Sequence, residues 1–413
     1  MTTIAEALSA WGGYDRDDPY PLFAELVAEG PVHKATLLDG HDVYLVVRHA
    51  EARAALGDTR LSKDIHAALA SGNDVVAEGL PGPAFARHML VVDPPDHTRL
   101  RRLVAGAFSV RRIEALQPRI EAIVDDLLDG IAGRGPDAVV DLVSCFAFPL
   151  PFTVICELLG IPGSERDELA RGLAVLLAPA ATAPENERAK AASDTVVALL
   201  ERLVREKQHQ PDDALVSALI VARDGDERLN QQELMSTIFQ LIVAGHDTTA
   251  SLLGNSVVAL LTHPEQLDEI RSDPSKLPVA IEELMRFDAP VPHATFRYAL
   301  EPIEFGGVTI PAGAQVLINL AAANRDGQFC PAPDVLDIDR ADVRHLGFGH
   351  GIHFCLGAPL ARMEGHIALA ALIRRFPQLR LAVPVDELHW GHGDGVVLRG
   401  LSELPVVPGP AVR

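Results

Sequence analysis

Cysteine is scarce in this 413-residue sequence, and basic residues do not outnumber acidic ones. The four cysteines are Cys145, Cys156, Cys330 and Cys355. Thiols spread so thinly along a chain do not make a disulfide framework, and their apolar neighbours suit a reducing compartment. The formal net charge of −21 excludes the basic footprint of a nucleic-acid-binding protein. We therefore expect no nucleic-acid partner and attribute the acidic surplus to solubility.

Patterns of a targeting or membrane-spanning segment are missing as well. The first residues, Met-Thr-Thr-Ile-Ala-Glu-Ala-Leu, lack the charged and apolar regions of a signal peptide. A long uncharged stretch at 305–324 is interrupted by Gly306, Gly307, Pro311 and Gly313, which predicts strands and turns rather than a membrane span. These features favour a cytoplasmic protein without a membrane anchor.

No Ser/Gly/Pro-rich linker, charge block or internal repeat divides the chain, although its length alone would allow two or three domains. Apolar residues make up 48 %, which is enough for a large core. Helical periodicity dominates, and strand patterns are short. The clearest helices are expected at 116–128, 193–207 and 229–261, and the strands at 43–47, 308–310 and 316–320. We predict a mainly α fold with small β-sheets, in one domain spanning 1–413.

Cys355 lies in the segment Phe348-Gly-His-Gly-Ile-His-Phe-Cys-Leu-Gly, in which glycines surround one cysteine. Gly349, Gly351 and Gly357 permit close backbone approach, as a loop against a flat, bulky ligand requires. The apolar run after Cys355 predicts a helix, whose free N–H groups and dipole favour a thiolate at its N-terminus. A thiolate of this kind is how proteins ligate haem iron through sulfur. The alternative is a buried structural thiol, the common state of a lone cysteine in an apolar run.

The longest predicted helix contains an unusual polar segment, Ala244-Gly-His-Asp-Thr-Thr. Glycine in mid-helix costs about 1 kcal/mol relative to alanine, and an acid with two hydroxyls adds the cost of burying polar groups. We interpret Gly245 as leaving room for a ligand, and Thr248 as bonding to preceding carbonyls and loosening the helix. A helix end, at which Asp247 and the threonines serve as caps, is the alternative.

Two further pairs have the spacing of neighbours on one helix face. His97 and Arg101, in the segment that begins at Asp93, are four residues apart. They suit a carboxylate, because arginine forms paired charge-assisted hydrogen bonds. Glu283 and Arg286 are three residues apart. Most such pairs are exposed and contribute little, but the apolar residues around this one favour partial burial.

These motifs together resemble those of cytochrome P450. The Cys355 segment is similar to the haem-binding loop Phe-Gly-x-Gly-x-His-x-Cys-x-Gly, and the segment from Ala244 is similar to the oxygen-activation motif Ala-Gly-x-Asp/Glu-Thr-Thr. The resemblance covers residues 20–401 and points to soluble bacterial P450s of the actinomycete type. Cys330 and Ala332 stand where polar or acidic residues are usual in the family, a departure that concerns the local surface and not the chemistry.

The resemblance implies the P450 fold and a haem b cofactor whose iron is ligated by the Cys355 thiolate. The implied partners of the haem propionates are His97, Arg101, Arg297 and His353, and the other implied haem contacts are Gly245, Phe348, Gly349 and Gly357. The resemblance assigns Asp247 and Thr248 to the acid–alcohol pair that relays protons to dioxygen during its cleavage. It also completes the Glu283–Arg286 pair with Arg340 as a structural triad.

The activity implied by the resemblance is a monooxygenase reaction that inserts one atom of O2 into a C–H bond, by hydroxylation or epoxidation. Electrons would come from a ferredoxin and its NAD(P)H-dependent reductase, and the chain is expected to be a monomer. A docking patch for the ferredoxin is suggested by the basic residues Arg99, Arg102, Arg111 and Arg112; ordinary solvated arginines are the alternative. A peroxide-driven enzyme and a non-catalytic haem sensor are rival functions, and the intact Asp247–Thr248 pair disfavours both.

Substrate-binding residues implied by the resemblance are mainly small and apolar. They are Val243, Ala244, Ala294 and Thr295, together with the segment 65–90. The segments 178–187 and 390–400 are expected to face the substrate as the lid region and the C-terminal loop; surface loops without that role are the alternative. A roomy apolar pocket suits a bulky lipophilic molecule such as a macrolide, another polyketide or a steroid.

Overall fold

We describe the fold from a computed structural model of the chain. It describes residues 14–36, 42–64, 85–177, 183–224, 227–391 and 398–412. The three segments predicted to face the substrate are described only in part. Residues 65–84, 178–182 and 392–397 of those segments lie outside the described residues.

Helices make up most of the described chain, and the strands are short. The α-helices are α2 Tyr20–Glu29, α3 His49–Gly57, α5 Asp96–Ala107, α6 Val110–Glu114, α7 Gln117–Ala132, α8 Pro149–Leu159, α9 Gly163–Leu176, α10 Ala183–His209, α11 Leu215–Val221, α12 Gln231–Thr262, α13 Pro264–Ser272, α14 Leu277–Phe287, α15 Leu320–Asn324 and α16 Ala358–Arg375. A π-helical turn, η2, spans Val143–Ala147, and the 3-10 turns are η3 Pro274–Lys276, η4 Gly351–His353 and η5 Val385–Glu387. The strands are β1 Val32–Thr36, β2 Asp42–Val46, β3 Leu61–Ser62, β4 Val140–Asp141, β5 Arg223–Asp224, β6 Glu227–Arg228, β7 His293–Ala299, β8 Ile303–Phe305, β9 Val308–Ile310, β10 Gln315–Asn319, β11 Arg380–Leu381 and β12 Pro405–Val407.

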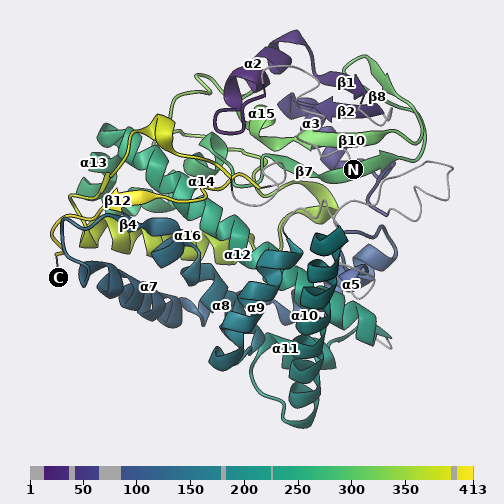
Figure 1. Ribbon diagram of the computed structural model, residues 1–413. Coiled ribbons are helices and arrows are strands. Elements are labelled where there is room, and N and C mark those ends of the chain that lie inside the picture. Colours follow the sequence, from purple (N-terminus) through teal and green to yellow (C-terminus); the bar gives the residue numbers. More distant parts are fainter. Residues whose placement is uncertain are drawn as a thin grey trace.

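The long helix α12 runs through the centre of the molecule (Figure 1) and contacts α8, α14 and α16. A five-stranded sheet of order β1-β2-β10-β7-β3 lies to one side of the helical part, together with α2, α3 and α15. Within it, β10 pairs in parallel with β2 and antiparallel with β7. The smaller sheets are β11-β12-β4, β5-β6 and β8-β9. The prediction of a mainly α fold with small β-sheets is confirmed.

The elements predicted from sequence periodicity lie close to their expected bounds. The predicted helices at 116–128, 193–207 and 229–261 correspond to α7, part of α10 and α12, and the predicted strands at 43–47, 308–310 and 316–320 correspond to β2, β9 and β10. The polar segment from Ala244 lies in the interior of α12, so the alternative of a helix end is wrong. Between β9 and β10 the chain passes from the β8-β9 hairpin into the five-stranded sheet.

A capping box fixes the start of α12. The Asn230 side chain accepts a hydrogen bond from the Glu233 N–H at 2.9 Å, and the Glu233 carboxylate accepts one from the Asn230 N–H at 2.9 Å. The same carboxylate pairs with Arg99 of α5, which ties the two helices together. Most residues of α12 are buried, as expected for a helix that is apolar on nearly all sides.

In the described ranges, no single helix is long and apolar enough to cross a membrane. The segments Val143–Leu159 and Gly163–Leu176 reach the required length and composition only as a pair, and they are bent by 119° relative to each other. Both contribute to the main apolar core, the first through Leu150 and Ile155 and the second through Leu169.

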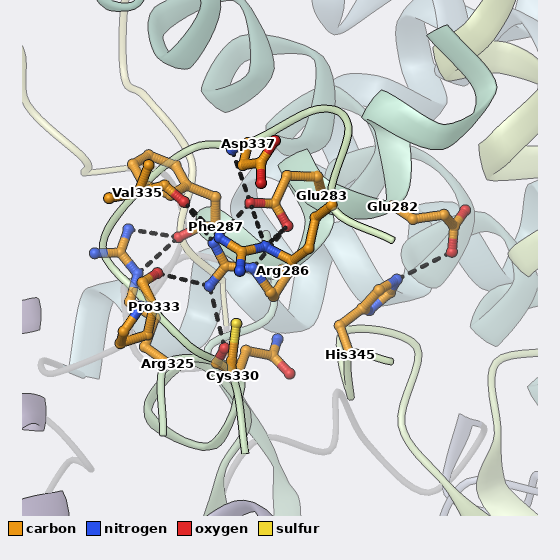
Figure 2. A network of polar contacts seen from close by, with 12 residues as sticks. Glu282, Glu283, Arg286, Phe287, Arg325, Cys330, Pro333, Val335, Asp337 and His345 are labelled. Carbon is orange, nitrogen blue, oxygen red and sulfur yellow. Dashed lines mark hydrogen bonds and ion pairs between the residues drawn. The ribbon is translucent and has the colours of Figure 1, made fainter. Parts of the chain in front are cut away.

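Glu283 and Arg286 of α14 form a buried ion pair (Figure 2). The Nε and Nη2 atoms of Arg286 donate to the two carboxylate oxygens of Glu283 at 2.7 and 2.8 Å. The Nε atom of Arg340 lies 3.2 Å from each of the same oxygens. The structure therefore brings the three members of the predicted triad together around one carboxylate.

The Arg286 guanidinium also holds the last residue of α15 and the irregular chain that follows it. It donates to the main-chain carbonyls of Asn324, Pro333 and Val335 at 3.2, 2.7 and 3.1 Å. Charge-assisted hydrogen bonds thus satisfy carbonyls that a helix or sheet would otherwise pair. Cys330, expected at the local surface, lies in this chain and is instead buried.

We predict that Glu283→Gln destabilises the protein by about 3 kcal/mol or more, because removing one member of a buried ion pair leaves uncompensated buried charge. The measurement is the free energy of unfolding in urea, followed by circular dichroism. The control is Asp342→Asn, since Asp342 and its partner Arg344 are 60 % and 72 % exposed; we expect a change within about 0.5 kcal/mol there. Equal, small losses in both variants would contradict the structural role of Glu283.

Candidate active site

Glycines with positive φ shape the loop that carries Cys355. Gly349 has φ +73° and Gly351 has φ +74°, a region that residues with a Cβ rarely adopt. A Cβ on Gly351 would lie 2.9 Å from the Leu56 carbonyl oxygen at the end of α3, so the packing also excludes a side chain. The Cys355 N–H donates to the Phe348 carbonyl oxygen at 2.9 Å and closes the loop. These constraints place Cys355 directly before α16.

The Cys355 thiol lies at the N-terminus of α16, as the sequence predicts. Gly357 is the N-cap of this helix, and the N–H groups of Gly357 and Ala358 donate to the sulfur. Burial raises the pKa of the thiol, whereas the two N–H groups and the positive charges of Arg101 and Arg362 lower it. Cys355 is nevertheless exposed, so its thiol is recessed among protein atoms but open on one side. The alternative of a buried structural thiol is therefore wrong.

An acid on α14 holds Arg362 beside the loop. The Nε and Nη2 atoms of Arg362 donate to the Glu282 carboxylate at 2.6 and 2.7 Å. The guanidinium carbon lies 4.4 Å from the centre of the Phe348 ring. Glu282 also lies 3.1 Å from the Nε2 atom of His345 (Figure 2). Neither Arg362 nor Glu282 is among the predicted site residues, because their contact joins two helices far apart in sequence.

Five basic side chains from four segments form a cluster. They are His353 of η4 and the four residues that act on it, Lys63 after β3, His97 and Arg101 of α5, and Arg297 of β7. Burial, and then the positive charges of the other four, lower the pKa of His353 to about 2. The rings of His97 and His353 have their centres 4.3 Å apart. The structure thus brings the four predicted propionate partners into one electrostatic cluster.

Two members of this cluster carry buried polar atoms without a hydrogen-bond partner among the described residues. They are both ring nitrogens of His97 and the Nε atom of Arg297. Unpaired buried donors cost free energy, and like charges held together cost more. An anion with several acceptor oxygens would remove both costs. Two carboxylates, such as the propionates of a haem, fit this set of donors.

Lys63 is the member of the cluster that no sequence pattern predicts, because a lone lysine after a short strand carries no periodic signal. It is buried, and burial followed by the charge of Arg297 holds the pKa of its amine well below its usual range. Its Nζ contacts the hydroxyl of Thr295. The main-chain N–H of Lys63 donates to the Asp93 carboxylate at 3.0 Å. Thr295, predicted to line the substrate pocket, is thus engaged by the cationic cluster.

One strip of α12 is accessible although the helix runs through the molecule. Ala244 is exposed, and Val243 and Thr248 are half-buried, in a helix whose other residues are mostly buried. The Thr248 hydroxyl donates to the Ala244 carbonyl oxygen at 2.8 Å, as predicted. Ala294 is also half-buried, and it lies on β7, the strand that carries Arg297. The predicted pocket residues are therefore reachable by a ligand.

Gly245 is half-buried next to this strip, and it also packs against α8. A Cβ on Gly245 would meet the Ile155 side chain of α8 at 3.2 Å, so the missing side chain makes room for helix packing. The interpretation that Gly245 leaves room for a ligand, and its contact with haem, stay predictions. Asp247 is buried, and its Oδ1 atom lies 3.0 Å from the Nε2 atom of His246.

The arginines of the suggested docking patch differ in their surroundings. Arg99 forms ion pairs with the buried Glu233 and with the partly exposed Asp96. Arg112 is half-buried and donates to the Asp213 carbonyl oxygen. Arg102 and Arg111 are exposed. The exposed pair is therefore the part of the patch that a partner can reach, and Arg99 is removed from it.

Stability should depend on pH through Glu282. Burial raises its pKa, but the hydrogen bonds from Arg362 and His345 outweigh burial and lower the pKa to about 2. A carboxyl whose pKa is lower in the folded than in the unfolded chain stabilises the fold above pH ~4, and this contribution is lost as pH falls toward ~2. We predict that Glu282→Gln lowers the free energy of unfolding by about 1–2 kcal/mol at pH 7, the partly exposed Arg362 reducing the full effect.

The difference in free energy of unfolding between Glu282→Gln and wild type should narrow as the pH of the measurement falls from 7 to 3. The exposed Glu304 of β8 provides a control: Glu304→Gln should follow wild type throughout. A gap that stays constant with pH would show that the ion pair contributes nothing through its charge.

Comparisons with known proteins agree with this geometry. The family model described as Cytochrome P450 matches residues 40–390. The vitamin D(3) 25-hydroxylase of Pseudonocardia autotrophica is 45 % identical over 410 residues, covering 99 % of this chain and 98 % of that relative. The 6-deoxyerythronolide B hydroxylase of Saccharopolyspora erythraea is 44 % identical over 396 residues, covering 94 % and 96 %.

Solved structures lead to the same family. The cytochrome P450 PksS of Bacillus subtilis 168 superposes with a TM-score of 0.88 at 36 % identity, covering 97 % of this chain and 99 % of that one. The similarity to this structure and to the hydroxylase relatives covers nearly the whole chain, and the family model covers most of it. This chain therefore belongs to the cytochrome P450 family and is a monooxygenase of the bacterial, actinomycete type.

Proposed function

We propose that the Cys355 thiolate ligates the iron of haem b. The observation that supports this most directly is a thiol that is both accessible and fixed by the N–H groups of Gly357 and Ala358. Arg101 and Arg362 add positive charge that favours the ionised sulfur. The Arg101 guanidinium also donates to the Phe354 carbonyl oxygen at 2.6 Å, which joins α5 to the loop. Haem held in this way would supply the binding and reductive activation of O2.

The basic cluster is proposed to receive the two haem propionates. His97, Arg101, Arg297 and His353 keep the roles expected from the resemblance, and Lys63 joins them. Contacts of Phe348, Gly349 and Gly357 with the haem face follow from the loop that positions Cys355. This assignment explains why basic groups from separate segments converge despite their mutual repulsion.

Asp247 and Thr248 are proposed to deliver protons for the cleavage of O2. The Thr248 hydroxyl donates to the Ala244 carbonyl oxygen, which leaves its oxygen lone pairs as acceptors beside the accessible strip of α12. Asp247 lies on the adjoining, buried side. A proton released from Asp247 can therefore be taken up next to the accessible strip without opening the helix.

The substrate is proposed to be a bulky lipophilic molecule such as a macrolide, another polyketide or a steroid. The relatives include a vitamin D(3) 25-hydroxylase and a 6-deoxyerythronolide B hydroxylase. Val243, Ala244 and Ala294 offer it small apolar surfaces, and Thr295 offers a hydroxyl at the edge of the basic cluster. Hydroxylation or epoxidation of such a substrate is the proposed reaction.

Electrons are proposed to come from a ferredoxin reduced by an NAD(P)H-dependent reductase. The exposed Arg102 and Arg111 support a docking site for an acidic partner, on and just after the helix whose Arg101 contacts the Cys355 loop. We further propose that residues 1–413 act as one catalytic domain, as a monomer in the cytoplasm.

The ligation proposal predicts a spectroscopic difference between two cysteine variants. Cys355→Ser should abolish the long-wavelength Soret band that thiolate ligation gives to the ferrous carbon-monoxide complex, together with ferredoxin-driven product formation. Cys145→Ser, at a half-buried free cysteine, should keep both. A Cys355→Ser variant that retains the shifted band would reject the assignment.

The docking proposal predicts a loss that depends on the source of electrons. Reversing the charge of Arg102 and Arg111 together to Glu should lower kcat/KM for ferredoxin roughly ten-fold, as for rim charges that steer association, and should weaken its salt dependence. Peroxide-driven turnover should not change. The control is Arg374→Glu near the end of α16, about 24 Å along the helix from Ala358. Unaltered ferredoxin kinetics in the double variant would remove this patch from the interface.

A further inference from the structure

Four residues of α12 follow one another at intervals of four along one side of the helix. They are Ser236, Gln240, Ala244 and Thr248, and residues at this spacing are neighbours on a helix face. Ala244 and Thr248 belong to the accessible strip, and Gln240 is half-buried as well. The strip therefore continues toward the N-terminal end of α12 and reaches a glutamine side chain.

Polar atoms in this extension of the strip are unpaired. The Oε1 atom of Gln240 and the hydroxyl of Thr237, three residues earlier, are buried and have no hydrogen-bond partner in the described part of the chain. A threonine within a helix can donate to the carbonyl four residues earlier, as Thr248 and Thr262 do at 2.8 Å. Thr237 makes no such bond. Unpaired buried polar atoms cost free energy, so a ligand that bonds to them gains what the fold leaves unused.

The end of the segment predicted to face the substrate packs beside this extension. The Arg87 N–H donates to the Ser236 hydroxyl at 3.3 Å. The rings of Phe85 and Phe239 are stacked, with their centres 4.0 Å apart. Ser236 and Phe239 lie four residues and one residue before Gln240, so the glutamine is placed between that segment and the accessible strip.

The unpaired groups at this point of α12 are polar but not ionic. Glu233 is the only ionisable residue from 231 to 240, and its carboxylate is paired with Arg99. A glutamine amide both donates and accepts hydrogen bonds, and a threonine hydroxyl does the same. Together they match a hydroxyl or a carbonyl oxygen. A carboxylate or an amine would bring an unpaired charge into a buried place, which is costly.

We propose that Gln240, with Thr237, anchors a neutral oxygen of the substrate, a hydroxyl or a carbonyl, at the end of the site remote from Thr248. The inference rests on the proposed function, in which a bulky lipophilic molecule is oxidised beside Thr248. Eight residues separate Gln240 from Thr248, which corresponds to about 12 Å along the helix axis. The anchor therefore selects lipophilic molecules that carry an oxygen function at one end, and it directs oxidation to carbons distant from that oxygen.

Probes with and without oxygen functions measure the anchor. One pair is the steroid testosterone and the hydrocarbon androstane, and the other is the macrolactone pentadecanolide and the hydrocarbon cyclopentadecane. Dissociation constants are obtained from the spectral change that each probe causes when it binds the haem-loaded enzyme. Gln240→Met keeps an unbranched side chain of similar length but removes the amide. We expect about ten-fold weaker binding of the oxygenated probes and unchanged binding of the hydrocarbons, because a site that bonds to a substrate oxygen discriminates against analogues without it.

Stability provides a readout that needs no substrate. Gln240→Met should not lower the thermal unfolding midpoint of the haem-loaded enzyme, because it removes an unpaired group. A glutamine that is bonded within the fold would instead lower the midpoint on substitution by a few degrees. The matched control is Gln231→Met, at the exposed first residue of α12. It should change neither the midpoint nor the preference for oxygenated probes.

Thr237→Val is a second variant, which keeps the shape of the side chain and removes the hydroxyl. We expect a several-fold loss of affinity for the oxygenated probes and none for the hydrocarbons. If Gln240→Met does not take up haem, the comparison between Thr237→Val and wild type decides.

The anchor and the proposed function fail separately. If wild type binds neither pair of probes, the proposed substrate class is rejected, and the anchor with it. If wild type binds the probes but shows no preference for oxygen, or keeps that preference in both variants, the anchor alone is rejected. A lowered unfolding midpoint in Gln240→Met would also overturn it, by assigning the amide to the fold.

Discussion

The structure depends on holding basic side chains together in a place where water is limited. Lys63, His97, Arg101, Arg297 and His353 come from four segments, and burial followed by the charges of the other four lowers the pKa of His353 to about 2. Repulsion of this kind opposes folding unless an anion lies among the donors. An anion held among these donors would therefore couple the positions of α5, β7 and the Cys355 loop, and a dianionic cofactor that binds only the folded chain would add to stability.

A second constraint is the rigidity of α12, which carries polar groups through the core. Its N-terminal end is held by the capping box of Asn230 and Glu233 and by Arg99. Toward the other end, Asn255 donates to the Arg399 carbonyl at 2.9 Å and accepts from the Trp390 indole at 3.2 Å. Because both ends are anchored, the costly segment between them can keep an exposed Ala244 and a buried acid in one regular helix.

Much of this arrangement could be predicted from local sequence, and the rest could not for physical reasons. Periodicity located α7 and α12 because a buried face repeats every 3.6 residues. Glycine spacing located the Cys355 loop because positive φ is visible as residue type. Lys63, Arg362 and the His246–Asp247 contact were not predictable, since each depends on which side chains a distant segment or a chosen rotamer brings together. The contact between Gly245 and Ile155 was not predictable either, because a sequence shows the missing Cβ but not which side chain lies where it would point.

The same device is found on both sides of the site: a charged or titratable group is held in place by a fixed second partner. Arg362 can act on the Cys355 sulfur only because Glu282 holds its guanidinium at 2.6 and 2.7 Å, beside the Phe348 ring. Asp247 lies 3.0 Å from the Nε2 atom of His246, whose Nδ1 atom is itself 2.7 Å from the Ile242 carbonyl oxygen. In each case a second residue holds the position of the group next to it. Sequence motifs mark the inner residues, whereas the outer ones define how strongly those residues hold a proton or a charge.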